Sequence, residues 1–224
     1  MKLEGLLVHQ PTRGAGYRAN VDAFHLARFA AAPTEGRTAT RTVAFDLGAG
    51  AGAVGLSLLA LHAVHRVVFV EIDPEAAAHA ERNVAAHGWT ARAEVLRADV
   101  AEAAEAHAGR AHLVVANPPY VEIGRGRAPA EARRARARMG SLEAFVVAAR
   151  KLAGRRARVC FVYPARELAT LFATLRASGL EPKRLRTVHA KGNAPARIVL
   201  VEAQPAKAGG LVLEPPLVEL APTR

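Results

Sequence analysis

Residues 42–55 read TVAFDLGAGAGAVG, a short apolar run that leads into three glycines, Gly48, Gly50 and Gly52. The apolar run, residues 42–46, is typical of a buried strand, and the Ala- and Leu-rich residues that follow, to residue 61, favour a helix. Glycine has no Cβ, so the chain can turn tightly and a ligand can approach the backbone N–H groups at the helix start. A strand, a glycine turn and a helix in this order predict a site for a nucleotide-like cofactor.

Acidic residues accompany the glycine turn at the ends of successive strands. Asp46 opens the turn, Glu71 ends a strand expected over residues 66–71, and Asp99 follows a strand expected over residues 93–96. Glu71 lies about 20 residues beyond the glycines, where a carboxylate can accept both hydroxyls of a ribose. Asp99 can accept a hydrogen bond from the amino group of an adenine, or it can cap the next helix.

The string GAGAVG, residues 50–55, also matches the G-x-G-x-x-G fingerprint of dinucleotide-binding proteins, so NAD is an alternative cofactor. Two features argue against it, because Asp46 would repel a pyrophosphate and the match begins one turn too late after the strand. A cofactor with a cationic amine and no phosphate suits Asp46 better. S-adenosylmethionine is such a cofactor.

A second motif follows the apolar strand expected over residues 112–116, and it consists of Asn117, Pro118, Pro119 and Tyr120. Two prolines fix the backbone and remove two N–H donors, so this corner presents bare carbonyls and a rigidly held amide. The Asn117 Oδ1 atom and the Pro118 carbonyl can each accept one N–H of a planar NH₂ group, which aims the nitrogen lone pair at an electrophilic methyl group. Tyr120 offers a face on which a base can stack. We expect this corner to be catalytic.

The rest of the chain predicts a single α/β domain. Apolar strands alternate with helical stretches, which is typical of a mostly parallel sheet with helices on both faces, a Rossmann-like arrangement. The seven expected strands cover residues 42–46, 66–71, 93–96, 112–116, 157–163, 183–188 and 198–203. Residues 3–18 are expected to be a short extended or hairpin segment. The expected helices follow Asp22 as an N-cap, run from the glycine turn to residue 61, and cover residues 74–87, 142–152 and 166–177.

These motifs together resemble the class I S-adenosylmethionine-dependent methyltransferases, and within them the Asn-Pro-Pro-Tyr branch that methylates amino nitrogens. Residues 10–23, QPTRGAGYRANVDA, and residues 193–200, NAPARIVL, resemble the bacterial tRNA1(Val) adenine-N6 methyltransferase family, over about residues 3–204 in all. Residues 20–22 are Asn-Val-Asp where that family usually has Gly-Thr-Asp.

The resemblance implies S-adenosylmethionine as the cofactor, with Asp22 near its methionine end. It implies adenine 37, beside the anticodon of a valine tRNA, as the substrate. The expected elements divide the chain into a cap segment and helix over residues 1–40, a methyltransferase domain over residues 41–204, and a proline-containing surface tail over residues 205–224 that could add one edge strand.

The formal net charge of +11 is unevenly distributed along the chain. Residues 1–109 hold 10 basic and 12 acidic residues, a net charge of −2, whereas residues 110–224 hold 21 and 8, a net charge of +13. A GC-rich genome enriches arginine, but it does not confine the excess to one half, so the pattern indicates RNA phosphates as partners rather than a solvated face alone. Basic runs cover residues 125–138, 150–158 and 183–197. The residues predicted to bind nucleic acid are Arg125, Arg127, Arg133, Arg134, Arg136, Arg138, Lys191 and Arg197.

Other substrates remain open at this point. A release-factor glutamine methyltransferase also binds a planar NH₂ group, but the residues before the glycine loop are too few for the helical domain that such enzymes imply. An rRNA guanine-N2 or adenine-N6 methyltransferase is a further alternative, and a non-catalytic RNA-binding domain with this fold is an alternative of another class. The intact Asn117 corner argues against the last.

The composition excludes several further classes. The chain has no stretch of 18 apolar residues and no secretory signal pattern, so a membrane span and export are not expected. Cys160 is the single cysteine, which rules out an intramolecular disulfide and suits a cytoplasmic location. The nine histidines do not cluster with carboxylates, so no metal is expected. The oligomeric state is not predicted, although a monomer is compatible with the sequence.

Overall fold

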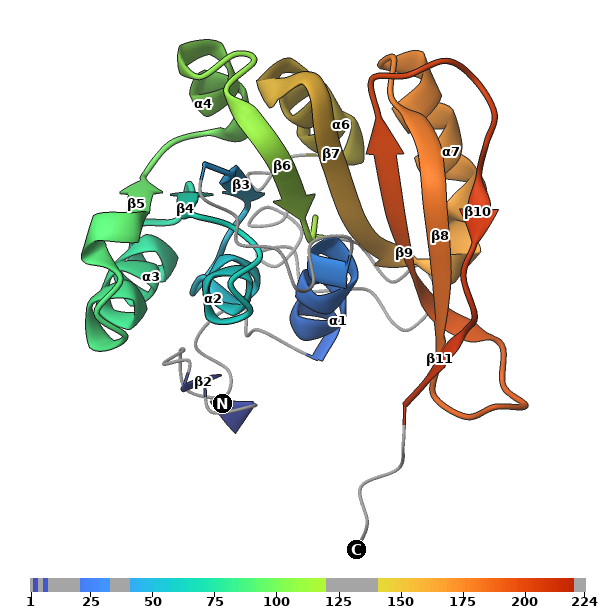
Figure 1. The fold of residues 1–224 in the computed structure, drawn as a ribbon, viewed down its shortest axis with the longest axis horizontal. Helices are drawn as coiled ribbons and strands as arrows, with labels where there is room; N and C mark the ends of the chain where they lie inside the picture. The colour runs from blue at the N-terminus through green and yellow to red at the C-terminus, as the bar shows by residue number, and fades with distance from the viewer. Residues whose placement is uncertain (1, 4–5, 8–20, 33–40, 120–140, 220–224) are drawn as a thin grey trace, which may run out of the picture.

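The structure is a computed structural model that describes residues 2–3, 6–7, 21–32, 41–119 and 141–219 (Figure 1). Its helices are α1 (Val21–Ala31), α2 (Ala53–Ala60), α3 (Pro74–Ala86), α4 (Val100–Ala106), α6 (Leu142–Leu152) and α7 (Leu168–Ala177), with 3-10 turns η2 (Thr90–Arg92) and η3 (Ala165–Glu167). Its strands are β1 (Lys2–Leu3), β2 (Leu6–Leu7), β3 (Val43–Leu47), β4 (Arg66–Val70), β5 (Ala93–Leu96), β6 (Ala111–Ala116), β7 (Ala153–Pro164), β8 (Glu181–His189), β9 (Ala196–Gln204), β10 (Val212–Leu213) and β11 (Leu217–Val218).

The main sheet has the strand order β10-β8-β9-β7-β6-β3-β4-β5, and β11 also pairs with β8. Strands β7, β6, β3, β4 and β5 are parallel, while β9 is antiparallel to both of its neighbours. The prediction of a mostly parallel, Rossmann-like sheet is therefore confirmed, and its seven long strands match the seven expected ones. Two more strands come from the C-terminal segment, because β10 and β11 both lie parallel to β8 at the sheet edge. At the N-terminus, β1 and β2 pair antiparallel as a small separate sheet.

Helices cover both faces of the main sheet (Figure 1). Helices α1 and α2, with Val84 of α3, pack in one apolar cluster, and α4, α6 and α7 pack in another. Successive strand residues point to opposite faces, so Ala44 belongs to the first cluster and Phe45 to the second. Burial on both faces explains why the central strands read as continuous apolar runs instead of alternating with polar residues.

Several boundaries, such as those of β8 and β9, are shifted by one or two residues from the expected ones, and two differences have structural consequences. Helix α1 begins at Val21, so Asp22 lies in its first turn and is not its N-cap. Strand β7 begins at Ala153 instead of residue 157, directly after α6, and its pairing with β6 shifts between Ala111↔Ala153 and Leu113↔Arg158. The extra β7 residues form a bulge, which the sequence hides because Gly, Arg and Arg at residues 154–156 show no apolar alternation.

Candidate active site

The strand register brings three predicted site residues together at the carboxyl edge of the sheet. Leu47 of β3 pairs with Val70 of β4 on one side and with Ala116 of β6 on the other. The chain therefore leaves these three adjacent strands at the same level. The residues that come next are Gly48, Glu71 and Asn117. Sheets of this kind bind ligands at the carboxyl ends of their strands, so the candidate active site lies here.

The glycine loop depends on backbone conformations that other residues rarely adopt. Gly48, Gly50 and Gly52 have φ angles of 64°, 56° and 88°, in the left-handed region. A Cβ on Gly48 would lie 3.0 Å from the ring of Phe145, which packs beneath the loop. A Cβ on Gly50 would meet nothing within 4 Å in the described part of the chain. Gly50 is therefore the point at which a ligand can approach the backbone.

Two further residues hold this loop in place, although neither is among the predicted site residues. A Cβ on Gly55 would lie 2.3 Å from Phe69 of β4, so this glycine allows α2 to pack closely on the sheet. Asn83 of α3 is fully buried, and its Nδ2 donates a hydrogen bond to the Ala51 carbonyl oxygen (2.9 Å). The available signal was the position of Asn83 on the buried stripe of α3 that also contains Ala80.

Asp46 lies below the loop with only 1% of its surface exposed. The Gly55 N–H donates to its Oδ2 atom (2.9 Å). The pKa of Asp46 is raised to about 7, chiefly because burial removes water from the carboxylate; the hydrogen bond from Gly55 opposes this shift, and the nearby charge of Glu71 adds to it. A carboxylate with this pKa favours a cation beside it, because a positive charge would offset the loss of hydration.

Glu71 connects the glycine loop to the start of α3. The Gly50 N–H donates to its Oε2 (2.7 Å) and the Asp73 N–H donates to its Oε1 (2.9 Å). Burial raises the pKa of Glu71, although these two hydrogen bonds oppose the shift. Each carboxylate oxygen keeps a second lone pair, so both can still accept a hydroxyl group. The neighbouring Ile72 is 45% exposed and adds an apolar surface at this edge, which sequence reasoning missed.

Asp99 takes the capping role that the sequence left open. It is the N-cap of α4, where its Oδ1 accepts a hydrogen bond from the Ala101 N–H (2.7 Å) and Glu102 completes a capping box. The side chain still lies beyond the carboxyl end of β5, three residues after Leu96. Contact between Asp99 and an adenine stays a prediction.

The proline corner follows β6 directly. Asn117 and Pro119 are partly exposed and Pro118 is buried, while Tyr120 lies outside the described residues. Because Asn117 follows Ala116 and Gly48 follows its pairing partner Leu47, the corner and the glycine loop are next to each other. An amine held at the corner would therefore lie beside whatever the loop binds.

The sequence model of the family described as "Methyltransferase small domain" matches residues 31–159, more than half of the chain. This chain belongs to that family. The resemblance to methyltransferases is thereby confirmed at the family level.

Curated relatives align with this methyltransferase small domain over parts of their length. A tRNA1(Val) (adenine(37)-N6)-methyltransferase from Enterobacter sp. (strain 638) is 34% identical over 160 residues, which cover 69% of this chain and 64% of the relative. The protein of the same name from Klebsiella pneumoniae (strain 342) is 40% identical over 81 residues, which cover 35% of this chain and 33% of the relative. This chain therefore spans between about a third and just under two thirds of these relatives.

Solved methyltransferase structures share the fold. A predicted O-methyltransferase from Agrobacterium tumefaciens superposes with a TM-score of 0.68 at 24% identity, covering 88% of this chain and 86% of that one. TYW2 from M. jannaschii in complex with AdoMet gives a TM-score of 0.60 at 15% identity, covering 90% and 83%. At these identities the likeness supports the fold alone.

In this methyltransferase domain, two predicted ligand-binding residues contact each other. Arg197 Nη2 lies 2.6 Å from Asp22 Oδ1 and 2.6 Å from Glu219 Oε1, and His25 Nε2 lies 3.1 Å from the same Glu219 oxygen. Asp22 is 1% exposed, and its hydrogen bond with Arg197 is the main reason that the pKa of Arg197 is raised. The cofactor role of Asp22 and the RNA role of Arg197 both stay predictions, and in the structure these two side chains bind each other.

Most of the other residues that are predicted to bind nucleic acid lie outside the described residues. Lys191 is exposed in the turn between β8 and β9. The remaining six lie outside the described residues, namely Arg125, Arg127, Arg133, Arg134, Arg136 and Arg138. Within the residues that are described, no group of three His, Cys, Asp or Glu side chains is arranged to hold a metal ion. The same residues contain no helix with the length and apolar character needed to cross a membrane.

Proposed function

We propose that this protein transfers a methyl group from S-adenosylmethionine to the exocyclic N6 of an adenine in a tRNA. The observation that carries the proposal is the pairing of Leu47 with Ala116, which sets the glycine loop and the Asn117 corner side by side. The relatives named tRNA1(Val) (adenine(37)-N6)-methyltransferase support the choice of adenine N6, and of tRNA position 37 in particular.

The residues of the loop fit this cofactor. Asp46 is a buried carboxylate whose raised pKa favours a nearby cation, and S-adenosylmethionine carries a sulfonium and an ammonium group. Glu71 has lone pairs left for the two ribose hydroxyls, and Ile72 and Asp99 offer apolar and acceptor surfaces for the adenine ring. Gly50 lets the ligand approach the backbone without a Cβ in the way. A pyrophosphate, as in NAD, would instead place negative charge beside the buried Asp46 carboxylate.

The protein's main task in this reaction is to position the amine. The cofactor supplies an electrophilic methyl group on its sulfonium sulfur. Asn117 Oδ1 and the Pro118 carbonyl would accept the two N6 hydrogens and aim the nitrogen lone pair along the breaking S–C bond. Transfer would form the N–C bond as the S–C bond breaks, and the nitrogen would then lose one proton to water. Because the proton leaves after attack, no strong general base is required of the chain.

The adenine has to leave its stack to reach this corner. Sequence-specific RNA recognition favours single-stranded loops, whose bases can be splayed out and stacked on aromatic rings. Tyr120 is proposed to stack on the base, and the basic residues of the second half of the chain are proposed to hold the RNA backbone.

The Asn117→Ala variant tests the corner. We expect it to bind S-adenosylmethionine with unchanged affinity and to retain its Tm, while turnover on tRNA falls at least about 100-fold, as when one preorganised polar group is removed from an active site. Calorimetric titration and thermal unfolding measure the two controls. Normal turnover in this variant would remove Asn117 from the reaction.

Substrate class is tested by incubating the protein with labelled cofactor and three acceptors: tRNA lacking the modification, similarly unmodified rRNA, and a release factor. Nucleoside and peptide analysis then locates the label. N6-methyladenosine in tRNA is the expected product. Label in a glutamine side chain or in rRNA would assign another substrate, and cofactor binding without transfer to any acceptor would indicate a non-catalytic domain.

A further inference from the structure

The arginines in the second half of the described chain separate into two groups. Arginines of the first group are neutralised by carboxylates, as Arg184 is by Glu202 (2.5 Å) and Glu214 (2.7 Å). Arginines of the second group are exposed and have no ion pair within the described ranges. This second group, here called the amino-edge patch, consists of Arg110, Arg150, Arg155 and Arg156.

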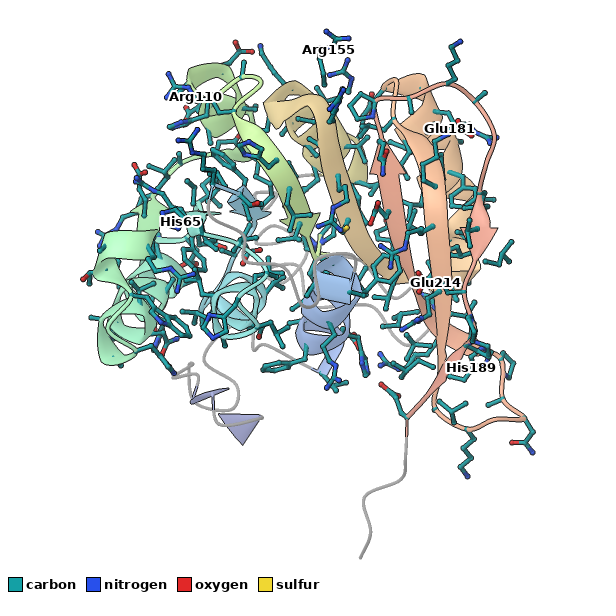
Figure 2. All side chains as sticks on the ribbon, viewed as in Figure 1. His65, Arg110, Arg155, Glu181, His189 and Glu214 are labelled. Carbon is teal, nitrogen blue, oxygen red and sulfur yellow. The ribbon has the colours of Figure 1, made fainter. Side chains whose placement is uncertain are left out.

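The fold brings the amino-edge patch together from two separate segments. The Gly109 N–H donates to the Lys151 carbonyl oxygen (2.9 Å), which sets the turn before β6 against the end of α6. Ala111 then pairs with Ala153, and the bulge that follows in β7 contains Arg155 and Arg156. Figure 2 shows Arg110 and Arg155 at the end of the sheet where β6 and β7 begin. The patch therefore lies at the edge opposite the candidate active site.

For two of the basic residues near this edge, contacts within the fold are enough to explain their positions. Lys151 forms an ion pair with Glu105 of α4, and both Lys151 and Arg150 complement the negative end of the α6 dipole. That explanation does not extend to Arg155 and Arg156, which lie in a strand bulge, or to Arg110, which precedes a strand. A bulge is a common means of turning side chains outward, and here it exposes two adjacent arginines.

We propose that the amino-edge patch binds the phosphate backbone of the RNA substrate, away from the base that is methylated. This inference rests on the proposed function. Arginine suits phosphate because its planar fork donates two parallel hydrogen bonds. A protein partner fits less well, because protein interfaces centre on aromatic and apolar anchors. None of the exposed large apolar side chains in the described residues belongs to the turn before β6, to the last turn of α6 or to the bulge.

The position of the patch determines which RNA can use it. Arg110 and Asn117 are separated by the length of β6, about 20 Å at the usual rise of a strand. A folded RNA of tRNA size can reach both edges of the sheet, whereas a short oligonucleotide bound at the corner cannot. Patch contacts should therefore strengthen binding of whole tRNA and leave short substrates unaffected.

The test compares two double variants that remove the same charge. Arg155→Gln with Arg156→Gln alters the patch, and Arg82→Gln with Arg97→Gln alters two exposed arginines elsewhere, one in α3 and one directly after β5. Each phosphate contact contributes about 0.9 to the slope of log affinity against log salt. Two lost contacts should reduce the slope by about 1.8, so the wild type should lose about tenfold more affinity than the patch variant between 50 and 200 mM salt.

Equilibrium binding of unmodified tRNA and of a short stem-loop with the target adenine provides the measurements. We expect the patch variant to bind tRNA with a reduced salt slope, to bind the stem-loop like the wild type, and to keep its affinity for S-adenosylmethionine and its Tm. The control variant should match the wild type on both RNAs. An unchanged tRNA slope, an equal loss on the stem-loop, or an equal loss in the control variant would each overturn the inference. Failure of the wild type to bind tRNA at all would instead refute the proposed function.

Discussion

Replacing Asp46 by asparagine should make the cofactor-free protein more stable at neutral pH. The side chain is buried, and its pKa is raised from 3.8 to about 7, chiefly because burial removes water from the carboxylate. Asparagine has nearly the same shape, and its amide oxygen can still accept the hydrogen bond from the Gly55 N–H. The Asp46→Asn variant therefore removes a buried negative charge and keeps the contact that orients it.

The magnitude follows from the difference between the folded and unfolded pKa values. A shift of about 3 units corresponds to about 4 kcal/mol. Because the folded pKa is raised, the contribution of Asp46 to stability is full below about pH 4 and is lost as the pH rises through about 7. Between pH 5 and pH 8, the free energy of unfolding of the wild type should fall by about 3 kcal/mol relative to that of Asp46→Asn.

Urea unfolding of both proteins without cofactor, at several pH values from 5 to 8, measures this difference. Any effect of the asparagine amide on the free energy of unfolding that does not depend on pH cancels. The comparison uses only how the difference between the two proteins changes with pH. If the free energies of unfolding of the two proteins changed with pH in parallel, Asp46 would have a normal pKa. That result would refute the interpretation of Asp46 as a buried carboxylate that is stabilised by a bound cation.

The same shift predicts that cofactor binding releases a proton near pH 6. A cationic ligand favours the charged form of Asp46, so the affinity for S-adenosylmethionine should fall as the pH drops below 7, by up to about tenfold per unit. Calorimetry in buffers with different ionisation enthalpies counts the released proton. Asp46→Asn should bind more weakly at pH 8 and show no proton release. Identical proton release in the variant would assign it to another group.

Two further substitutions separate stability from function. Arg197→Met removes one ion-pair partner of the buried Asp22 and should lower the free energy of unfolding by about 2 kcal/mol, less than for a fully buried pair because Arg197 is 38% exposed. Arg166→Met removes an exposed ion pair and should lower the free energy of unfolding by under about 1 kcal/mol in the same denaturation assay. At both Gly48 and Gly50 an alanine would have to adopt a left-handed backbone, which lowers the free energy of unfolding by about 1–2 kcal/mol. Gly48→Ala also adds a steric contact with an aromatic ring of α6, whereas Gly50→Ala adds none. Gly50→Ala should therefore have the higher Tm of the two and still bind cofactor poorly in calorimetry, and full affinity in that variant would show that no ligand approaches Gly50.

The local parts of the site were predictable from the sequence. The glycine turn and the proline corner each depend on a few consecutive residues whose backbone restrictions are intrinsic, so Gly48 and Pro118 mark their positions without knowledge of the fold. The central strands were predictable for a similar reason, since burial on both faces makes each of them a continuous apolar run.

Contacts between distant residues were not predictable. Arg197 and Asp22 are 175 positions apart, and in the sequence Arg197 looks like any surface arginine available for phosphate. The path of the C-terminal segment was equally hidden, because β10 and β11 are only two residues each and pair with β8 through contacts such as the Glu214 N–H with the Leu185 carbonyl oxygen (2.8 Å). Only the folded sheet shows that Glu219, at the end of this segment, reaches Arg197.

The basic residues in the second half of the chain divide into those that stabilise the fold and those for which we propose RNA binding. Part of it stabilises the sheet, where Arg184 lies 4.4 Å from the centre of the Phe29 ring and bridges Glu202 and Glu214, which ties α1 and the C-terminal segment to β8 and β9. The acidic residues of this half that form ion pairs within the described ranges are Glu167, Glu181, Glu202, Glu214 and Glu219.

Because these carboxylates cancel the charge of their arginine partners, the net positive charge of this half resides on other residues. In the described part those residues include the amino-edge patch, and the run over residues 125–138 adds more. If the protein binds RNA as proposed, its net charge is therefore a poor guide to that affinity. Removing an arginine that pairs with Glu202 should weaken the fold, whereas removing one from the bulge in β7 should weaken only RNA binding, although both changes lower the net charge equally.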